Sequence, residues 1–341
     1  MRQDDRFDDL AASLGGFYRT WLVYIGIELG LFAALRDAAD GGLTPDALAA
    51  ATGCAVGPIE VWAWAADAHE LVTFDDGRLT SDPDTATVLL DDRAPEFLGG
   101  QIVHAVVASL DWDRMLDFFR TGAPVRQRPD RYRVAIERLT VQDVAVFFQE
   151  ALAALPQLVA DLGRGSPRVV DIHCGGGRWL IAMARRFPNL ELVGIEFEAD
   201  SVERARHNVE SAGLADRIAI EQADIAKRTR ETEVDLAYFQ YALHQLPDPP
   251  AALRAAAASL RPGGRVLVMD WAMPSTVDEF RTRHGELVAG VQLDEVFQGT
   301  GLATRETFQG WFRDAGLGDA QVIDLPSGAS VFLATRDEAA G

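Results

Sequence analysis

The second half of the chain alternates short apolar runs with helix-like segments, and this order constrains the fold more than any other feature. Five runs are expected to be buried strands: 168–172, 190–197, 218–224, 234–243 and 265–271. Helix-like segments follow three of them: 178–187, 200–213 and 249–260. A repeated strand-then-helix order predicts a mostly parallel sheet with helices on both faces. A last helix at 305–315 precedes two strands, 320–325 and 329–335, which are expected to form an antiparallel pair at the sheet edge.

The first strand runs into a glycine-rich loop, DIHCGGGR at 171–178. Ligands of open parallel sheets bind at the carboxyl ends of the strands, so this loop is the expected binding site. A phosphate-binding P-loop needs the pattern GxxxxGK[ST], and no lysine follows these glycines. A dinucleotide fingerprint needs GxGxxG, but Arg178 stands where the third glycine would close onto the sheet. The spacing therefore disfavours nucleoside triphosphates, NAD and FAD.

The pattern that does fit is an acidic residue followed by alternate glycines, with one change. Asp171, Gly175 and Gly177 hold the expected positions, and His173 stands in place of the first glycine. This pattern resembles motif I of class I S-adenosylmethionine (SAM) methyltransferases. The resemblance implies a Rossmann-like α/β fold with SAM as cofactor. His173 is expected either to lie beside the methionine part of SAM or to fill space at the strand end, and packing is favoured.

Acidic residues at the ends of the next two strands extend the resemblance. Glu196 stands where family members place an acid on the ribose hydroxyls, and Asp224 where an acid meets the adenine amino group. The segment LRPGGRVLVMD at 260–270 matches the family's turn into the fifth strand. A carboxylate accepts two hydroxyl hydrogen bonds well, and a sulfonium cation suits an acidic protein. The cofactor contacts implied are Asp171, His173, Cys174, Gly175, Gly177, Glu196, Phe197, Asp224, Ile225 and Gln240.

The N-terminal region has the pattern of a winged helix. Residues 8–39 have helical periodicity, and Thr44 and Pro45 suit the start of a short helix. A further helix is expected at 58–71, and two short strands around an Asp-Gly turn follow it. Winged helices bind DNA or serve as dimerisation modules. Since 58–71 carries no Arg or Lys to neutralise phosphates, dimerisation is favoured, and a ligand-responsive DNA-binding regulator is the alternative.

The whole chain resembles small-molecule methyltransferases with an N-terminal winged-helix dimerisation domain, such as plant caffeate and bacterial natural-product O-methyltransferases. We expect a mainly α-helical winged-helix domain at 1–94, a helical linker or cap at 95–155, and the SAM-binding domain at 156–341. The resemblance implies a homodimer formed through the N-terminal domain and a small-molecule acceptor. It also implies that Trp21 and Tyr24 contribute to the partner subunit's acceptor pocket.

Charge and hydropathy narrow the choice of partners. The formal net charge is −20 and the pI is about 4.6, so the surface repels nucleic acid and anionic membranes. The longest apolar stretch, 21–35, is interrupted by Glu28 and is too short to cross a bilayer. The two cysteines, Cys54 and Cys174, form no zinc-binding pattern, and the acidic N-terminus is unlike a signal peptide. A cytoplasmic protein is expected.

A histidine after the fourth strand is the expected catalytic base. Histidine titrates near pH ~6.5, which suits proton abstraction at neutral pH. His244 matches the catalytic histidine of the O-methyltransferase relatives, and Asp270 matches one of its two supporting acids. At the position expected for the other acid the chain has Leu302, with Glu306 nearby. A base without its orienting acid is weaker, so O-methylation is favoured while carbon or nitrogen methylation, or a SAM-binding protein that does not methylate, stays open.

Residues at the sheet's carboxyl edge and in the covering segments are expected to form the acceptor pocket. These residues are Tyr241, Trp271, Met273, Trp112 and His284. Together with His244, the group His284, Asp294 and Glu295 has ligand types that also suit iron. Their spacing is irregular, so surface polar residues are the favoured interpretation and no metal is expected.

Overall fold

The computed structural model describes residues 3–38, 41–227 and 233–336, which divide into two compact units. The first unit comprises the chain up to Arg114 together with Arg128–Ala145. The second comprises Met115–Gln127 and the chain from Val146 onward. Residues 95–155 thus contribute to both units. The predicted three-part division with boundaries after 94 and 155 stays a prediction.

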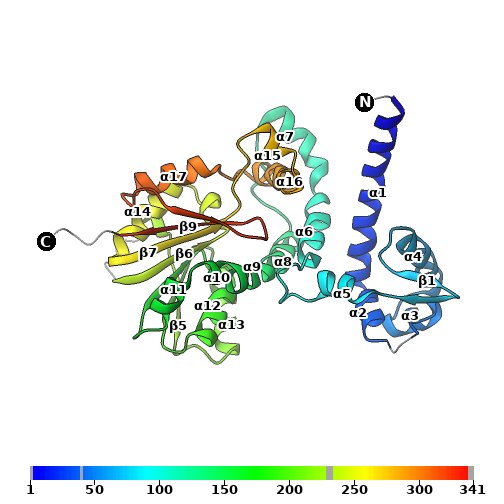
Figure 1. The fold of residues 1–341 in the computed structure, drawn as a ribbon, viewed down its shortest axis with the longest axis horizontal. Helices are drawn as coiled ribbons and strands as arrows, with labels where there is room; N and C mark the ends of the chain where they lie inside the picture. The colour runs from blue at the N-terminus through cyan, green and yellow to red at the C-terminus, as the bar shows by residue number, and fades with distance from the viewer. Residues whose placement is uncertain (1–2, 39–40, 228–232, 337–341) are drawn as a thin grey trace. The chain divides into compact units, whose positions relative to one another are not determined.

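The first unit is helical, with one small hairpin (Figure 1). Its helices are α1 (Gln3–Glu28), α2 (Leu31–Arg36), α3 (Pro45–Thr52), α4 (Val56–Ala68), α5 (Pro83–Leu90), α6 (Gly99–Ser109), α8 (Asp130–Leu139) and, up to the unit boundary, α9 (Val141–Val146). The strands β1 (Thr73–Asp75) and β2 (Arg78–Thr80) pair antiparallel. This order of helices followed by a hairpin agrees with the predicted order.

Local backbone chemistry sets these boundaries. The helix expected over 8–39 is broken, because Gly30 adopts a left-handed conformation at φ 70° between α1 and α2. Thr44 caps α3 by accepting a hydrogen bond from the Ala47 amide at 3.2 Å. In the hairpin turn, Asp76 and Gly77 both have positive φ, as a two-residue type I′ turn requires.

A compact apolar core holds the first unit together. Leu31, Phe32, Leu48 and Trp62 are buried in it, and the rings of Phe32 and Trp62 meet edge to face at 5.5 Å. The indole nitrogen of Trp62 donates to the Leu22 carbonyl at 3.1 Å, which ties α4 to α1. Because the polar end of a buried indole needs a partner, this bond fixes how the two helices pack.

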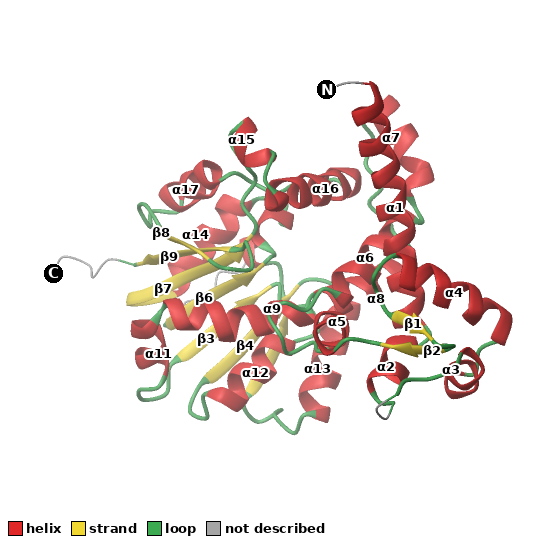
Figure 2. Cartoon of the chain, turned by 45° about the vertical axis from the view of Figure 1, so that its right-hand side comes forward, coloured by secondary structure: helices red, strands yellow, loops and turns green. Residues whose placement is uncertain are grey.

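The second unit is built on a seven-stranded sheet in the order β5-β4-β3-β6-β7-β9-β8 (Figure 2). Its strands are β3 (Arg168–Ile172), β4 (Glu191–Glu196), β5 (Ile218–Gln222), β6 (Val234–Gln240), β7 (Leu260–Asp270), β8 (Gln321–Asp324) and β9 (Ser330–Thr335). The first five are parallel, and β9 runs antiparallel to both β7 and β8. The predicted Rossmann-like sheet with an antiparallel edge is confirmed.

Two strand boundaries differ from the prediction by three residues or more. The expected turn at 261–264 lies inside β7, because Leu260 already pairs with Val234 ahead of a register shift in the ladder. The fourth strand ends at Gln240 instead of 243, because Tyr241 has φ 48° and turns the chain out of the sheet.

Helices cover both faces of the sheet (Figures 1 and 2). One face packs against α14 (Pro249–Ser259) and α17 (Arg305–Asp314), where Leu253, Phe308, Phe312 and Phe332 form the core with the inward side chains of the strands. The other face carries α11 (Pro156–Leu162), α12 (Arg178–Arg186) and α13 (Ala199–Ser211). The remaining helices are α7 (Met115–Thr121), α10 (Leu152–Ala154), α15 (Val277–Phe280) and α16 (Arg283–Gln298), of which the last two were not expected.

A π-helical turn, Phe147–Ala151, lies between α9 and α10. It places the fully buried Phe147 against the rings of Trp179 and Tyr238, at 5.1 Å and 5.0 Å between centroids. π-helical turns are rare and frequent at functional sites. Here the turn anchors the start of the second unit on the α12 face of the sheet.

No single helix in the described ranges is both long and apolar enough to cross a membrane, although two pairs of helices bent by more than 40° pass that test together. The predicted cytoplasmic location stays a prediction.

Candidate active site

Two strained residues mark the carboxyl edge of the sheet. His173 and Tyr241 have φ of 64° and 48°, a left-handed conformation that costs free energy in any residue with a Cβ. They follow β3 and β6, which are neighbours in the sheet, and no other described residue of the second unit except glycine has positive φ. The chain runs from β3 outward to β5 and returns at β6, so this is the switch point where open α/β sheets bind ligands.

The glycine loop after β3 is fixed by its own backbone. The amides of His173 and Cys174 donate to the Ile195 carbonyl of β4, and the Gly177 amide donates to the Cys174 carbonyl at 2.9 Å. Gly177 has φ 73° and begins α12, a conformation that glycine adopts without cost. The loop therefore presents backbone at the N-terminus of a helix.

Room for this loop comes from a glycine inside β4. A Cβ added at Gly194 would lie 2.7 Å from the Cys174 sulfur, 2.7 Å from Leu180 and 2.8 Å from Ile220. Cys174 therefore packs down onto the sheet. Its Sγ faces Gly194.

The Glu196 carboxylate at the end of β4 is buried and densely hydrogen bonded. It is 1% exposed, and it accepts hydrogen bonds from the amides of Gly175, Phe197 and Glu198 at 2.9–3.1 Å. The His173 Nδ1 atom lies 3.2 Å from Oε2 of the same carboxylate. Glu196 thus joins the glycine loop to the end of β4, as the resemblance implies for a ribose-binding acid.

The charges of Asp171, His173 and Glu196 influence one another strongly. Burial raises the pKa of Asp171 to about 8, the Glu196 carboxylate adds to the rise, and His173 opposes it. Burial would lower the pKa of His173, but Glu196, Glu198 and Asp171 outweigh it and raise that pKa. Burial likewise works against ionisation of Glu196, yet His173 and the backbone amides hold the pKa of Glu196 below its usual value. These interactions favour an ionised Glu196 beside a protonated His173.

The other predicted cofactor residues lie along the same edge. Phe197 directly follows Glu196 and is half exposed, whereas Ile225 is buried just beyond β5. Asp224 is exposed, and its side chain pairs with Lys227 at 2.8 Å. The Gln240 side chain is held by the Tyr238 hydroxyl, which donates to its Oε1 at 3.1 Å.

Beyond β6, a buried imidazole lies between two carboxylates. His244 stands on a single turn of 3₁₀ helix, Leu243–Gln245, and its Nδ1 lies 2.8 Å from Oδ2 of Asp270 at the end of β7. Its Nε2 lies 3.8 Å from Oε2 of Glu295 on α16. Glu295 is fixed in turn by Thr300 Oγ1 at 2.5 Å and Gln298 Nε2 at 3.0 Å.

This arrangement corrects the prediction of a missing second acid. Leu302 is buried, and its amide donates to the Gln292 side chain, while Glu306 is exposed on the first turn of α17. Glu295 supplies the second carboxylate from an earlier position in the sequence. Asp294 and Glu295 were expected to be surface residues, but both are buried. No local sequence pattern shows that one turn of α16 faces His244.

The two carboxylates control the protonation of His244. Burial alone lowers the pKa of this imidazole, but Asp270 and then Glu295 raise it to about 10. The ring is therefore an imidazolium at neutral pH in the free protein. Its Nε2 is buried and has no hydrogen-bond partner among the described residues. One nitrogen is held by Asp270, and the other is left for an incoming group.

Only some of the predicted pocket residues gather at this histidine. Tyr241 and Trp271 meet edge to face at 5.7 Å, and Trp271 directly follows Asp270. Met273 forms a bridge with Thr304, next to the same edge. His284 packs against Gly328 and lies eleven positions, roughly 16 Å, before Glu295 along α16. Trp112 belongs to the first unit.

The described residues contain no group of three His, Cys, Asp or Glu side chains placed to hold a metal ion. In particular, the iron-type set considered from the sequence is not assembled, because His284 is far along α16 from Glu295.

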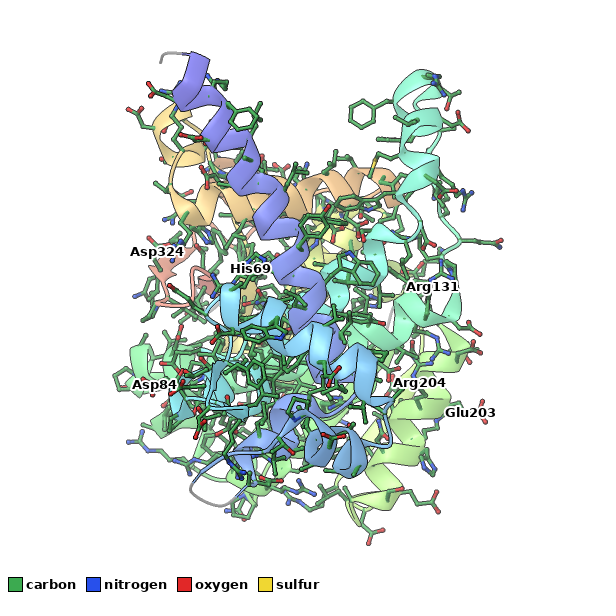
Figure 3. The ribbon with its side chains drawn as sticks, turned by 90° about the vertical axis from the view of Figure 1, so that its right-hand side faces the viewer. His69, Asp84, Arg131, Glu203, Arg204 and Asp324 are labelled. Atoms are coloured by element: carbon green, nitrogen blue, oxygen red, sulfur yellow. The ribbon has the colours of Figure 1, made fainter. Side chains whose placement is uncertain are left out.

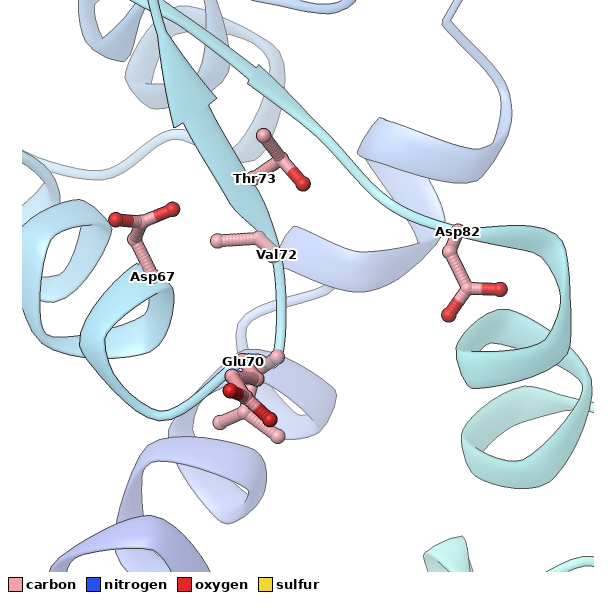
Figure 4. A pocket seen from close by; sticks show the side chains of 6 residues that line it. Asp67, Glu70, Val72, Thr73 and Asp82 are labelled. Carbon is pink, nitrogen blue, oxygen red and sulfur yellow. The ribbon is translucent and has the colours of Figure 1, made fainter.

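A pocket in the first unit is not a second candidate for the active site. It is lined by Asp67, Glu70, Leu71, Val72, Thr73 and Asp82 (Figure 4). Asp67 accepts a hydrogen bond from the Phe74 amide, and Asp82 caps α5 through the amides of Asp84 and Thr85. These carboxylates are explained by the local structure they stabilise.

The residues at the edge of β3, β4 and β5 fit SAM. Gly175 has φ 52° and open space where a side chain would stand, so backbone can approach a ligand closely. A buried carboxylate at the end of β4 suits a ribose diol. The one departure is His173, a bulky ring where the motif has glycine. The fold and this edge together define the class of SAM-dependent methyltransferases with a Rossmann-like sheet.

Comparison with known proteins supports this assignment to a class. Residues 145–322, about half of the chain, match the methyltransferase domain family, and the chain belongs to that family. It is thus an enzyme whose cofactor is SAM.

Curated relatives match over part of their length. The 27-O-demethylrifamycin SV methyltransferase of Amycolatopsis mediterranei is 28% identical over 193 residues, covering 55% of this chain and 66% of its own. The aclacinomycin 10-hydroxylase RdmB of Streptomyces purpurascens is 33% identical over 187 residues, covering 51% and 48%. The matched regions therefore span about half to two-thirds of these relatives.

Solved structures resemble the whole chain. The mitomycin 7-O-methyltransferase MmcR has a TM-score of 0.73 at 21% identity and covers 98% of both chains. PigF, solved with S-adenosylhomocysteine (SAH), has a TM-score of 0.76 at 18% identity and covers 98% of this chain and 99% of its own. At this identity the likeness shows the fold.

Proposed function

We propose that this enzyme transfers the methyl group of SAM to a hydroxyl group of a small aromatic or hydrophobic metabolite. The observation that carries the proposal is His244, held at 2.8 Å by Asp270 and 3.8 Å by Glu295 at the carboxyl edge of the sheet. An imidazole between carboxylates at this edge suits proton removal from a hydroxyl.

SAM supplies a methyl group made electrophilic by its sulfonium. Asp270 accepts the Nδ1 proton of His244 and so fixes the ring with Nε2 free for the acceptor. In the free protein that nitrogen carries a proton, because the pKa of His244 is raised to about 10. A positive charge bound nearby lowers that pKa, so the cationic cofactor favours the neutral ring that a base requires. Tyr241 and Trp271 offer an aromatic wall for the acceptor.

Replacing the base tests the proposal. We expect His244→Ala to lose roughly 10²–10⁴-fold in turnover of an acceptor found in a panel of hydroxylated aromatic compounds, since that is the usual effect of general-base catalysis. SAH affinity, measured by calorimetry, should stay within twofold of the wild type. His207→Ala, on the exposed side of α13, is the matched control. Full turnover by His244→Ala would remove this residue from the mechanism.

A second candidate is a SAM-binding homologue that methylates carbon or nitrogen or does not methylate at all. It is favoured by the relative RdmB, which is named a 10-hydroxylase. The mass of the product formed with SAM separates the candidates: a hydroxylated product with no added methyl group would contradict the methyltransferase proposal.

A DNA-binding regulator is disfavoured by the chemistry of α4. This helix has no Arg or Lys, and it exposes Val61 and Trp64. Binding to duplex DNA relies on neutralising phosphates. Tight binding of random DNA at physiological salt would contradict this conclusion.

We infer that the enzyme is a homodimer formed through its first unit, in keeping with a winged-helix dimerisation domain. The basis is α1, shown as the blue ribbon facing the reader in Figure 3. Phe7, Leu10, Leu14 and Phe17 recur at spacings of three and four, and each is more than half exposed. Such a stripe is the seam of a coiled coil, and a second copy of α1 is its natural partner.

A further inference from the structure

His173 is a side chain in a position built for glycine. It has φ 64°, a left-handed backbone conformation that favours glycine. The imidazole lies parallel to Phe197, with centroids 5.5 Å apart and an interplanar angle of 14°. Its Nδ1 lies 3.2 Å from the Glu196 carboxylate. One ring thus contacts two of the residues expected to bind the nucleoside of SAM.

The Glu196 carboxylate has no free acceptor position in this arrangement. A carboxylate offers about four lone-pair sites. Oε1 accepts from the amides of Phe197 and Glu198, and Oε2 accepts from Gly175. His173 faces the remaining site, as an ion pair without the alignment of a good hydrogen bond. Of the four groups, only the imidazole can leave by rotating a side chain.

We propose that His173 is a latch on the cofactor site: in the free protein its protonated ring holds Glu196 and covers Phe197, and SAM or SAH binds by displacing it. This inference rests on the proposed cofactor role of Glu196. It makes His173 a residue that sets cofactor affinity, not one that takes part in the transfer of the methyl group.

The latch makes cofactor binding depend on pH. The charged groups that act on the ring are Asp171 on β3, Glu196 at the end of β4 and Glu198 just beyond it. The three carboxyl groups raise the pKa of His173 against the effect of burial, whereas burial raises the pKa of the Cys174 thiol and keeps it neutral. A displaced ring regains an ordinary pKa near ~6.5.

The direction of the pH dependence follows from whether cofactor binding releases a proton from His173. Below about pH 6.5 the ring is protonated both in the free protein and after displacement, so affinity does not change with pH. Between that value and the raised pKa, displacement releases a proton, and affinity rises by up to roughly tenfold per pH unit. Above the raised pKa the latch is neutral and the affinity levels off.

Calorimetric titration of SAH into the full chain between pH 6 and pH 9 tests the proposal. His173→Gly suits the left-handed backbone and removes the latch. We expect it to bind SAH at least fivefold more tightly than the wild type near pH 6.5, with the difference vanishing at alkaline pH. His173→Gln, which fills space without a charge, should also lose the His173-dependent rise. Both variants remove the positive charge that lowers the pKa of Asp171, so the titration of Asp171 is altered in the same direction in each and their comparison controls for it.

Weaker SAH binding by His173→Gly at every pH would overturn the proposal and make His173 a cofactor contact. Equal SAH binding by the wild type and His173→Gly at every pH would also overturn it and would mean that His173 only fills space.

A second readout is independent of affinity. The NMR titration of the His173 ring, assigned by its absence in His173→Gly among six histidines, should give a pKa above 6.5 that falls when SAH is added. An unchanged pKa would contradict displacement. Neither measurement uses turnover. A protein that binds SAH in this way but forms no methylated product contradicts the proposed function alone, whereas failure of wild type and variant to bind SAH contradicts the latch.

Discussion

At the carboxyl end of β6, one imidazole is set between carboxylates from elements far apart in the sequence. Asp270 fixes the ring through Nδ1, and Glu295 faces Nε2 from α16. Both raise the pKa of His244, and Asp270 has the larger effect. We propose that Asp270 chiefly orients the ring through Nδ1, whereas Glu295, which faces Nε2, adjusts the pKa of the ring.

Glu295→Gln separates these roles. Removing the charge at 3.8 Å should lower the pKa of His244 from about 10 while Asp270 keeps the ring in place. The alkaline rise in kcat/KM, which reports the free enzyme, then moves to lower pH. The NMR titration of the His244 ring measures the shift without an acceptor. Asp270→Asn, the comparison variant, should lose activity at every pH. A profile for Glu295→Gln that drops uniformly without moving would mean that Glu295 is only structural.

For individual site residues, the prediction from the sequence was least complete. Glu196, His244 and Asp270 lie at strand ends, so their places follow from the strand order. Glu295 was considered only within a metal-type set, and its place beside His244 was missed because α16 was not expected and the contact joins elements far apart in the sequence. The pairing of His173 with Glu196 depends on a left-handed φ that no sequence pattern specifies.

At the level of elements, the strands were predicted well because each is a short apolar run, and helix-like segments follow three of them. Strand β3 matches its expected bounds, and β4, β5 and β6 differ by at most three residues at either end. Errors fall where single residues override the pattern, as Gly30 and Tyr241 do through positive φ. The π-helical turn at Phe147–Ala151 has no sequence signature of its own.

The fit of the glycine loop on β4 gives a prediction for an element. Gly194→Ala places a Cβ within 2.8 Å of Cys174, Leu180 and Ile220, and such overpacking costs about 1–3 kcal/mol. We expect a lower free energy of unfolding in urea and weaker SAH binding, because the loop must shift. Gly310→Ala on α17, where a Cβ meets nothing within 4 Å, is the control and should be neutral or stabilising. Unchanged stability of Gly194→Ala would show that the loop is not packed as described.

At the scale of the whole molecule, the exposed stripe on α1 is the main feature that one chain leaves unexplained. Water-exposed Phe and Leu side chains at coiled-coil spacing favour association with a second copy. The acidic net charge of −20 opposes association, so the apolar seam has to supply the attraction.

Sedimentation velocity tests the dimer. Leu14→Glu with Phe17→Glu places charges in the seam and should convert a dimer to a monomer at micromolar concentration. Ala12→Glu, at an exposed position outside the stripe, adds a charge without touching it and should leave the dimer intact. A wild-type protein that sediments as a monomer at tens of micromolar would contradict the proposal.

We propose that the enzyme transfers the methyl group of SAM with His244 as the base. The most direct measurement is the mass of the product formed from hydroxylated aromatic acceptors and SAM that carries a trideuterated methyl group. We expect a product in which one hydrogen is replaced by the labelled methyl group, and we expect His244→Ala to lose this product although it still binds SAH. A product that gains oxygen but no label, or labelled product formed undiminished by His244→Ala, would contradict it.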